Sequence, residues 1–178
     1  RIAGILNDRA NAKFGKKYLN FTYVDFIDDE EVVNALFDAV EGWAKELGCQ
    51  AMHGPLGFSD MDREGMLVEG FDQKSLFYTY YNHPYYLSHM TRLGYAKQVD
   101  WVEMRLTLPQ KPDASLSRVA EYVKKRKKLH VVNLGERPIK CFMEDMFSLY
   151  NNTYQVLFGM VPMTDAQMVK YTGEFRPM

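Results

Sequence analysis

The sequence predicts a mixed α/β fold of the α+β kind, and three observations support it. A long amphipathic helical pattern over residues 29–47 lies between two short segments with strand composition, residues 20–27 and 49–53. This strand–helix–strand order predicts a parallel pair of strands joined by a right-handed crossover. The chain has 178 residues, of which 47% are hydrophobic. A chain of this size can bury a core without disulfides or metals.

Further strands are predicted on both sides of this unit. Residues 1–7 have the apolar character of a strand, and the polar residues 8–17 after them predict a turn. Short strands are expected at residues 66–68 and 77–80. Residues 95–108 alternate between bulky and polar side chains, which predicts one long strand.

The helices of the first half are marked by the residues at their ends. Residues 29–47 carry an apolar stripe at helical spacing, with Asp28 as the expected N-cap and Glu31 as the return half of a capping box. Gly48 is expected to end this helix. Residues 84–93 predict a second helix, because proline stands in its first turn and glycine follows it.

The second half is predicted to be mainly helical. Prolines at the ends of a short polar stretch predict a linker at residues 109–113. Helices are expected at residues 115–125, at residues 139–157, which are strongly amphipathic, and at residues 164–171. A short strand is expected between the first two of these helices, at residues 129–134.

A glycine-rich polar loop follows the strand predicted at residues 49–53. Gly57, Gly65 and Gly70 permit unusual backbone angles, and α/β proteins usually bind ligands in loops that follow buried strands. The tyrosine-rich residues 76–87 combine apolar area with hydroxyl groups. We expect the loop to border the main cleft, with at least two of the tyrosine hydroxyls of residues 80–86 facing the same space. The candidate substrate-binding residues are His53, Gly54, Gly57, Ser59, Asp60, Tyr80, Tyr81, Asn82, Tyr85 and Tyr86.

A structural interpretation of the same residues stays open, in which turn residues hold a long connection and the tyrosines fill a core. His53 and the carboxylates after it, up to Glu64, match no metal-binding pattern, so no metal site is predicted. Ser59 lacks the G-x-S-x-G context of a nucleophile elbow. The catalytic residues are therefore left unassigned.

The charge balance bears on the class of partner. The 22 basic and 23 acidic residues nearly cancel, so the chain as a whole has no electrostatic drive toward nucleic acid or anionic lipid. The basic run at residues 124–128 lies at a predicted helix end, where cations complement the helix dipole. We expect a solvated helix end there and no nucleic-acid partner, and salt-dependent DNA binding would test the opposite hypothesis.

The cysteines and the apolar runs indicate a compartment. Cys49 and Cys141 stand far apart without further cysteine or histidine at zinc spacing, which indicates reduced thiols and a cytoplasmic location. No apolar run is long enough to span a membrane, and no signal-peptide pattern opens the chain. Residue 1 is arginine inside a strand-like segment, which indicates an excerpt of a longer polypeptide.

Several segments together resemble one family. They are RIAGILNDRAN, ALFDAVEGWAKELG, GPLGFSDMDREGMLVEGFD, NHPYYLSHMTRLGYAKQVDWVEMRL and LYNNTYQVLFGMVPMTDAQM. These segments resemble an uncharacterised group of bacterial proteins with tandem units of the GNAT type, the acyl-CoA N-acyltransferase fold. The resemblance implies an incomplete first unit, residues 1–108, a linker at residues 109–113, and the start of a second unit at residues 114–178.

The resemblance also implies an activity. It is an acyl-CoA-dependent N-acyltransferase that uses acyl-CoA or acetyl-CoA and an unknown small-molecule or acyl acceptor. Residues 20–27 and 49–53 would be the fourth and fifth strands, which splay apart in this fold to admit the acyl-CoA. The chain has IDDEEV where the family places its glycine-containing phosphate motif, and Met90 where many members have a proton-donating tyrosine.

These departures mean that no catalytic or cofactor-binding residue carries over from the family. The carboxylates of IDDEEV would repel a pyrophosphate, so we expect no CoA pyrophosphate at the start of helix 29–47. The alternative function is a non-catalytic module with a degenerate GNAT fold that binds a small molecule or an acyl group.

Overall fold

The computed structural model describes residues 1–76, 79–111, 113–133 and 138–175. Its internal contacts divide the chain into two compact units. Unit 1 comprises Arg1–Asp100 and Leu149–Thr164, and unit 2 comprises Trp101–Ser148 and Asp165–Met178. Unit 1 therefore includes a segment from late in the sequence, whereas the expected units were the sequential ranges 1–108 and 114–178. That the chain holds two GNAT-like units stays a prediction.

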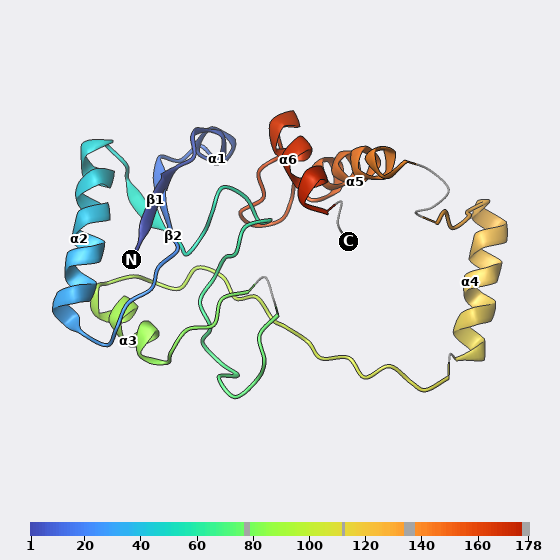
Figure 1. Cartoon of the computed structure of the whole chain (residues 1–178), viewed down its shortest axis with the longest axis horizontal. Helices are drawn as coiled ribbons and strands as arrows, with labels where there is room; N and C mark the ends of the chain where they lie inside the picture. Colours follow the sequence, from blue (N-terminus) through green and yellow to red (C-terminus); the bar gives the residue numbers. More distant parts are fainter. Residues whose placement is uncertain (77–78, 112, 134–137, 176–178) are drawn as a thin grey trace. The chain divides into compact units, whose positions relative to one another are not determined.

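The sheet of unit 1 has three strands in the order β1–β2–β3; β1 and β2 are labelled in Figure 1. The strands are β1 (Ala3–Leu6), β2 (Tyr18–Thr22) and β3 (Ala51–His53). β1 runs antiparallel to β2, with Ile5 opposite Asn20. β2 runs parallel to β3, with Asn20 opposite His53. The parallel pair predicted around the long helix is confirmed, and the fold is mixed α+β.

The parallel strands stay together beyond the end of β3. The backbone amide of Leu56 donates to the carbonyl of Phe21 over 2.9 Å. Gly54 makes this approach possible, because a Cβ at this position would collide with the same Phe21 carbonyl. The splay between the fourth and fifth strands that the GNAT resemblance implies is thus not present at this point.

A short helix replaces the turn predicted at residues 8–17. α1 (Asp8–Phe14) is capped by Asn7, whose side chain accepts from the amide of Ala10 over 3.1 Å. Gly15 ends it in the left-handed conformation, with φ of 61°. The prediction was wrong because α1 buries no side chain, so its sequence carries no apolar stripe and its caps were the remaining signal.

The long helix is α2 (Glu30–Glu46), as predicted, but its cap is one residue later than expected. Asp29 accepts from the amide of Val32 over 3.0 Å. Asp28 instead bonds the Nε2 atom of the buried His89, at 2.8 Å. Gly48 follows the helix with φ of 67°, which confirms its expected role.

The core of unit 1 lies between α2 and the sheet. Phe21 and Phe37 are fully buried and pack edge to face, with ring centroids 5.4 Å apart. Tyr95 packs against both rings. Leu19 joins Val40 in the second half of the same interface. The apolar stripe of the helix therefore finds its partner on one face of the sheet.

Four further helices complete the described secondary structure: α3 (Tyr85–Arg92), α4 (Ala114–Lys127), α5 (Ile139–Thr153) and α6 (Asp165–Phe175). All four were predicted. Gly94 follows α3 with φ of 83°, in agreement with its expected role as terminator. α5 is shorter than expected because the chain turns after Thr153, and α6 runs beyond the expected end at residue 171.

Four predicted strands are absent from the residues that the structure describes. Residues 66–68, 95–108 and 129–133 have no strand assignment, nor have Thr79 and Tyr80, while residues 77–78 and 134 lie outside the described part. Side chains of the longest segment are exposed, as with Met104 at 79%. An alternating pattern forms a strand only where a neighbouring strand supplies its hydrogen bonds, and the strand pairs of the described residues involve only β1, β2 and β3.

Candidate functional site

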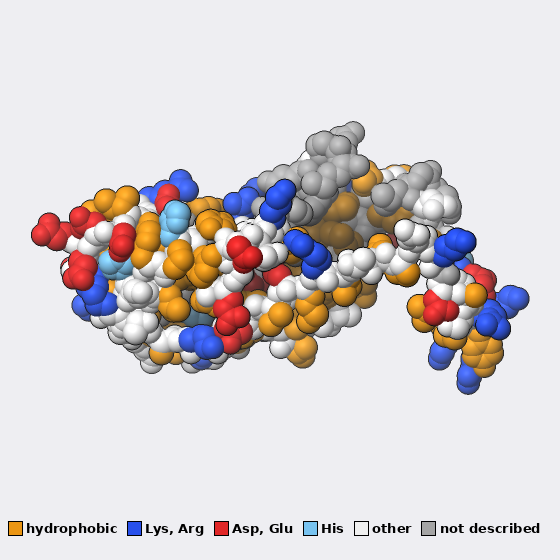
Figure 2. All heavy atoms as spheres, turned by 90° about the horizontal axis from the view of Figure 1, so that it is seen from below, with side chains coloured by type: hydrophobic (Ala, Val, Ile, Leu, Met, Phe, Trp, Pro, Cys, Tyr) orange, Lys and Arg blue, Asp and Glu red, His pale blue; other side chains and the backbone are white. Residues whose placement is uncertain are grey.

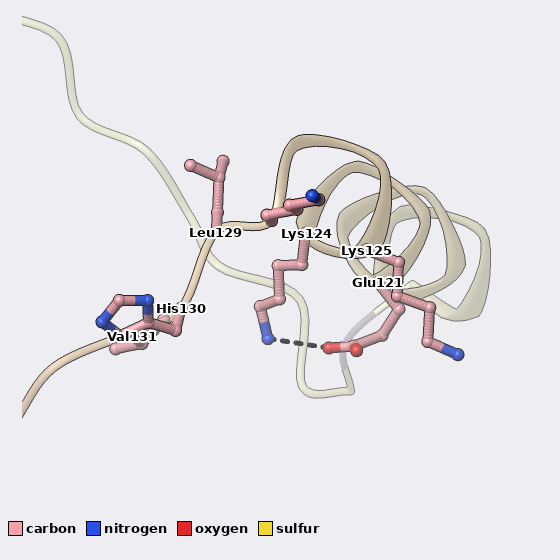
Figure 3. Close-up of a pocket in the computed structure, with 7 residues that line it drawn as sticks. Glu121, Lys124, Lys125, Leu129, His130 and Val131 are labelled. Atoms are coloured by element: carbon pink, nitrogen blue, oxygen red, sulfur yellow. Dashed lines mark hydrogen bonds and ion pairs between the residues drawn. The ribbon is translucent and has the colours of Figure 1, made fainter.

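Two hollows compete as a candidate site. The larger, of about 640 Å³, lies beside the C-terminal end of α4. It is lined by exposed side chains of the helix end and the segment after it, and Lys124 is engaged with Glu121 over 2.7 Å (Figure 3). Lys and Arg side chains lie beside hydrophobic ones over α4 (Figure 2). This is the solvated basic helix end expected from the sequence, and it is too open to define a ligand.

The smaller hollow, of about 360 Å³, lies in unit 1 and is called the sheet pocket here. Its position follows from the alternation along β2: Leu19 and Phe21 face α2, so Tyr18 and Asn20 face the opposite side. Both of these residues line the pocket. Its apolar walls comprise Phe14, Leu56, Val156, Leu157, Phe158 and Val161.

Polar groups of two neighbouring strands lie at the base of these apolar walls. His53 of β3 is paired in register with Asn20 of β2, and both line the pocket. Asn20 is only 7% exposed, and its Nδ2 donates to the carbonyl of Gly57 over 3.1 Å. A mostly apolar cavity with a few converging polar groups is the usual form of a small-molecule site.

His53 is held as a neutral imidazole. Burial lowers the pKa of His53, and the positive charge of Lys16 lowers it further. The ring of Phe158 packs edge to face against the imidazole, with centroids 5.5 Å apart. A neutral imidazole can accept a proton at neutral pH, so this residue offers general-base chemistry inside the pocket.

Hydrogen bonds fix the wall formed by the late segment of unit 1. The Nζ of Lys13, on α1, donates to the carbonyl of Gln155 over 3.0 Å and to that of Met160 over 2.7 Å. Across the pocket, Asn7 Nδ2 donates to the carbonyl of Phe58 over 2.8 Å. The wall is thus attached to α1, and the residue that caps α1 is attached in turn to the glycine loop.

The glycine loop is folded on itself by one carboxylate. Asp62 Oδ2 accepts from the amides of Phe58 and Ser59, at 2.7 and 3.3 Å. Gly57 permits this, because a Cβ there would collide with the side chain of Asp62. Ser59 is 2% exposed and its Oγ accepts from the amide of Met61. These contacts stabilise the loop and leave only its first residues at the pocket.

Glu64 is a half-buried acid beside the outer wall of the pocket. Burial, and after it the nearby charges of Asp60 and Asp62, raise the pKa of Glu64 to about 7. Its Oε2 atom is buried, and no described residue forms a hydrogen bond with it. Gly159 in the wall stands close to both Leu56 and this oxygen. The wall therefore packs over a carboxyl group that titrates near neutral pH.

The predicted loop residues divide into two groups. His53 and Gly57 line the sheet pocket, so the glycine loop borders it as expected. Gly54 serves the contact between the strands, and Ser59 serves the loop itself. Asp60 accepts a hydrogen bond from the hydroxyl of Tyr150. These last three side chains are not part of the pocket lining.

The expectation that tyrosine hydroxyls face the same pocket was wrong. Tyr85 donates to the carbonyl of Phe26 over 2.9 Å, and Tyr86 donates to Asp25 over 3.1 Å. These bonds hold α3 against the segment after β2. Both residues stand among the aromatic core next to Phe26, where the ring of Tyr86 stacks at 4.1 Å.

The remaining residues of that stretch are also structural. Tyr81 donates to the carbonyl of Phe71 over 3.1 Å. Asn82 is buried and bonds both the amide and the carbonyl of Leu67, at 2.7 and 3.1 Å. Tyr80 packs against the guanidinium of Arg63, 5.9 Å from its ring centroid. None of these residues lines the sheet pocket.

Sequence reasoning missed most of the pocket lining. Asn20 stands between Leu19 and Phe21, and a polar residue inside such an apolar strand was the available signal. Lys16 and Tyr18 lie in or next to the segment that was expected to be a turn. Residues 155–161 come to the pocket from a distant part of the sequence, and no local pattern indicates that contact.

Two further properties concern the part of the chain that the structure describes. No group of three or more His, Cys, Asp or Glu side chains there is arranged to hold a metal ion. None of its helices combines the length and the apolar character needed to cross a membrane.

Comparisons with known proteins place the chain beside one curated relative. Protein YghO of Escherichia coli (strain K12) is 30% identical to it over 171 residues. The alignment covers 93% of this chain and 42% of that protein, so the chain spans less than half the length of this relative. No family model matches the chain, and no solved structure matches it.

Proposed function

We propose that unit 1 is the substrate-binding part of a GNAT-like N-acyltransferase that uses acyl-CoA or acetyl-CoA. The observation that carries this proposal is the neutral His53 at the base of an apolar pocket of about 360 Å³. The apolar walls suit an acyl group, and the imidazole suits the proton transfer that acylation of an amine requires.

Transfer of an acyl group from a thioester to an amine requires one base at this position. The acceptor reacts as its neutral amine: as its nitrogen bonds to the thioester carbon, the carbon–sulfur bond breaks and the nitrogen loses a proton. His53 accepts this proton and passes it to the departing thiolate, which leaves as a thiol. Because the pKa of His53 is lowered, the residue is ready to act as a base at neutral pH.

The topology supports the proposal in outline only. An antiparallel strand followed by a parallel strand–helix–strand unit agrees with the GNAT resemblance. Asp29 caps α2, and Glu30 and Glu31 occupy its first turn, so a pyrophosphate there would meet like charge. We therefore propose that the acyl group lies on the face of the sheet and that the CoA phosphates bind outside unit 1.

A non-catalytic binding module is the second candidate. Two observations favour it: the acidic start of α2, and the bond between Leu56 and Phe21 that keeps the strands closed. In this case the pocket holds a small molecule or an acyl group without transfer. Cys49 and Cys141 are free thiols, which agrees with the cytoplasmic location that we propose for either function.

The test uses the 178-residue chain with S-hexanoyl-pantetheine, a thioester without the CoA phosphates, and a mixture of primary amines. Binding is followed by NMR and transfer by mass spectrometry. We expect transfer, and we expect His53→Gln to slow it about 10²- to 10⁴-fold. His83→Gln is the matched control, because His83 stacks on Tyr85 outside the pocket.

The possible results of this test distinguish the acyltransferase from the binding module. Binding without transfer refutes the acyltransferase and favours the module. If the thioester does not bind, both functions fail for this pocket. Equal rates for the native chain and for His53→Gln would remove the histidine from the reaction.

A further inference from the structure

We infer that the sheet pocket recognises an uncharged carboxamide on an apolar ligand and rejects a cationic head group. This inference deepens the proposed function and rests on it in one respect: the same pocket is taken as the binding site. The carboxamide is also the group that acylation of an amine produces, so the pocket would hold the product of the proposed reaction.

Asn20 supplies the acceptor. The carbonyl of Gly57 can only accept, so the NH₂ end of the Asn20 amide must face it. Oδ1 is thereby the free end of a side chain that is more than nine-tenths buried and lines the pocket. No group in the described ranges donates to Oδ1. An acceptor at the wall of the pocket, on a side chain that is otherwise buried, can take a donor from the ligand.

His53 supplies the complementary group. None of the described residues forms a hydrogen bond with either ring nitrogen of His53. The ring of Phe158 packs against the imidazole. As a neutral imidazole, His53 carries one N–H donor. Because β2 and β3 pair Asn20 with His53 in register, an acceptor and a donor stand side by side. A carboxamide offers the matching pair, with its N–H toward Asn20 and its carbonyl toward His53.

The charges of the lining exclude a cation. No carboxylate belongs to the described lining of the pocket, whose charged member is Lys16. The Nζ of Lys16 lies 5.1 Å from the ring centroid of Tyr18. A buried ammonium would find no counter-charge and would be repelled by this lysine. A carboxylate would gain from Lys16 but would place its oxygens against Oδ1 of Asn20, so the uncharged head group is favoured.

The test compares three ligands with a similar aliphatic chain at pH 7: hexanamide, hexylammonium and hexanoate. Dissociation constants are measured by NMR titration of the 178-residue chain. We expect hexanamide to bind at least about tenfold more tightly than either charged ligand. Asn20→Leu should remove most of this preference. Asn152→Leu, at an exposed position in α5, is the control and should keep it.

The ligand series on the native chain decides the matter even if Asn20→Leu fails to fold. Equal affinities, tighter binding of hexylammonium or hexanoate, or no binding of any ligand at millimolar concentration would overturn the inference. Preference for hexanamide without acyl transfer would support the inference and refute the proposed acyltransferase. Acyl transfer without this preference would support the acyltransferase and refute the inference.

Discussion

The two faces of the small sheet in unit 1 differ in almost every physical property. On the α2 side, Leu19 and Phe21 are fully buried and belong to the hydrophobic core. On the other side, Tyr18 and Asn20 face a cavity walled by loop segments. Four consecutive residues of β2 thus serve both a closed core and an open pocket.

The comparison shows that the alternation of side chains along one strand lets it take part in a core on one face and a pocket on the other. Side chains of successive strand residues point to opposite faces, so a stable core and a binding surface can share a backbone. The core face is held by a long capped helix. The pocket face is held by side-chain bonds to loop carbonyls, such as those of Lys13. Mutations on the two faces should therefore have different consequences.

The largest effect is expected on the core face. Phe37→Ala should lower the free energy of unfolding by about 3–5 kcal/mol, because it empties a fully buried site between three aromatic rings. Urea unfolding followed by circular dichroism measures this. Val32→Ala, in the same helix but 38% exposed, should cost well under half as much. Similar losses for both would contradict the packing described for this face.

An intermediate effect is expected where the pocket meets the glycine loop. Gly57→Ala should cost about 1–3 kcal/mol, because the added methyl group displaces Asp62 and opens the loop. Gly42→Ala is the opposite case: it lies in α2 with free space around it, and it should stabilise by about 0.5–1 kcal/mol. Thermal unfolding of both variants gives the sign. A stable Gly57→Ala chain would contradict the loop geometry.

A pH-dependent effect distinguishes the outer wall of the pocket. Because the pKa of Glu64 is raised from 4.5 to about 7, the folded chain keeps a proton that the unfolded chain releases. The contribution of Glu64 to the free energy of unfolding is therefore fully present below pH 4.5 and is lost as pH rises through 7. For this half-buried group the loss is about 1–2 kcal/mol after allowance for solvent screening.

Glu64→Gln should remove that slope, so that the variant is more stable than the native chain at pH 8 and equal to it near pH 4.5. Urea unfolding at a series of pH values measures it. Glu69→Gln, at an exposed position of the same loop, should leave the slope unchanged. A native chain whose stability is flat between these pH values would refute the assignment.

The smallest effect is expected in local dynamics. Lys13→Met removes the bonds from Nζ to the carbonyls of Gln155 and Met160. Hydrogen exchange of residues 155–160 should accelerate by about tenfold, the equivalent of roughly 1 kcal/mol, with little change in global stability. Lys45→Met, in the last turn of α2, is the control. Unchanged exchange in the wall would show that other contacts hold it.

The sequence was sufficient for elements with long or well-marked patterns. The stripe of α2 and the glycines after α2 and α3 each carry a local signal, and these predictions were confirmed. Asp28 was expected to be the cap because Glu31 stands three residues later, as in a capping box, yet the adjacent Asp29 has the extended backbone that a cap needs. His89 takes Asp28 instead, and that contact is long-range.

The rest of the site could not be predicted because it depends on distant contacts. Residues 155–161 reach the pocket through a return of the chain that no local pattern encodes. The tyrosines were assigned to the pocket by mistake, because a tyrosine ring fits a pocket and a core equally well. Tyr85 and Tyr86 belong to the core, where their hydroxyls form hydrogen bonds with Phe26 and Asp25. The strand prediction for extended segments such as residues 95–108 was wrong because strand propensity takes effect only beside a neighbouring strand.

The alternation along β2 also has a consequence for divergence. Leu19 and Phe21 are tied to the helix packed over them, so substitutions there must conserve volume and apolarity. Tyr18 and Asn20 border a cavity instead, and they can change with the ligand while the core stays intact. A saturation library over these four positions, sorted for folded protein, should accept wide variety at the even positions and little at the odd ones. Specificity in this fold can then be retuned by neighbours of the very residues that hold it together.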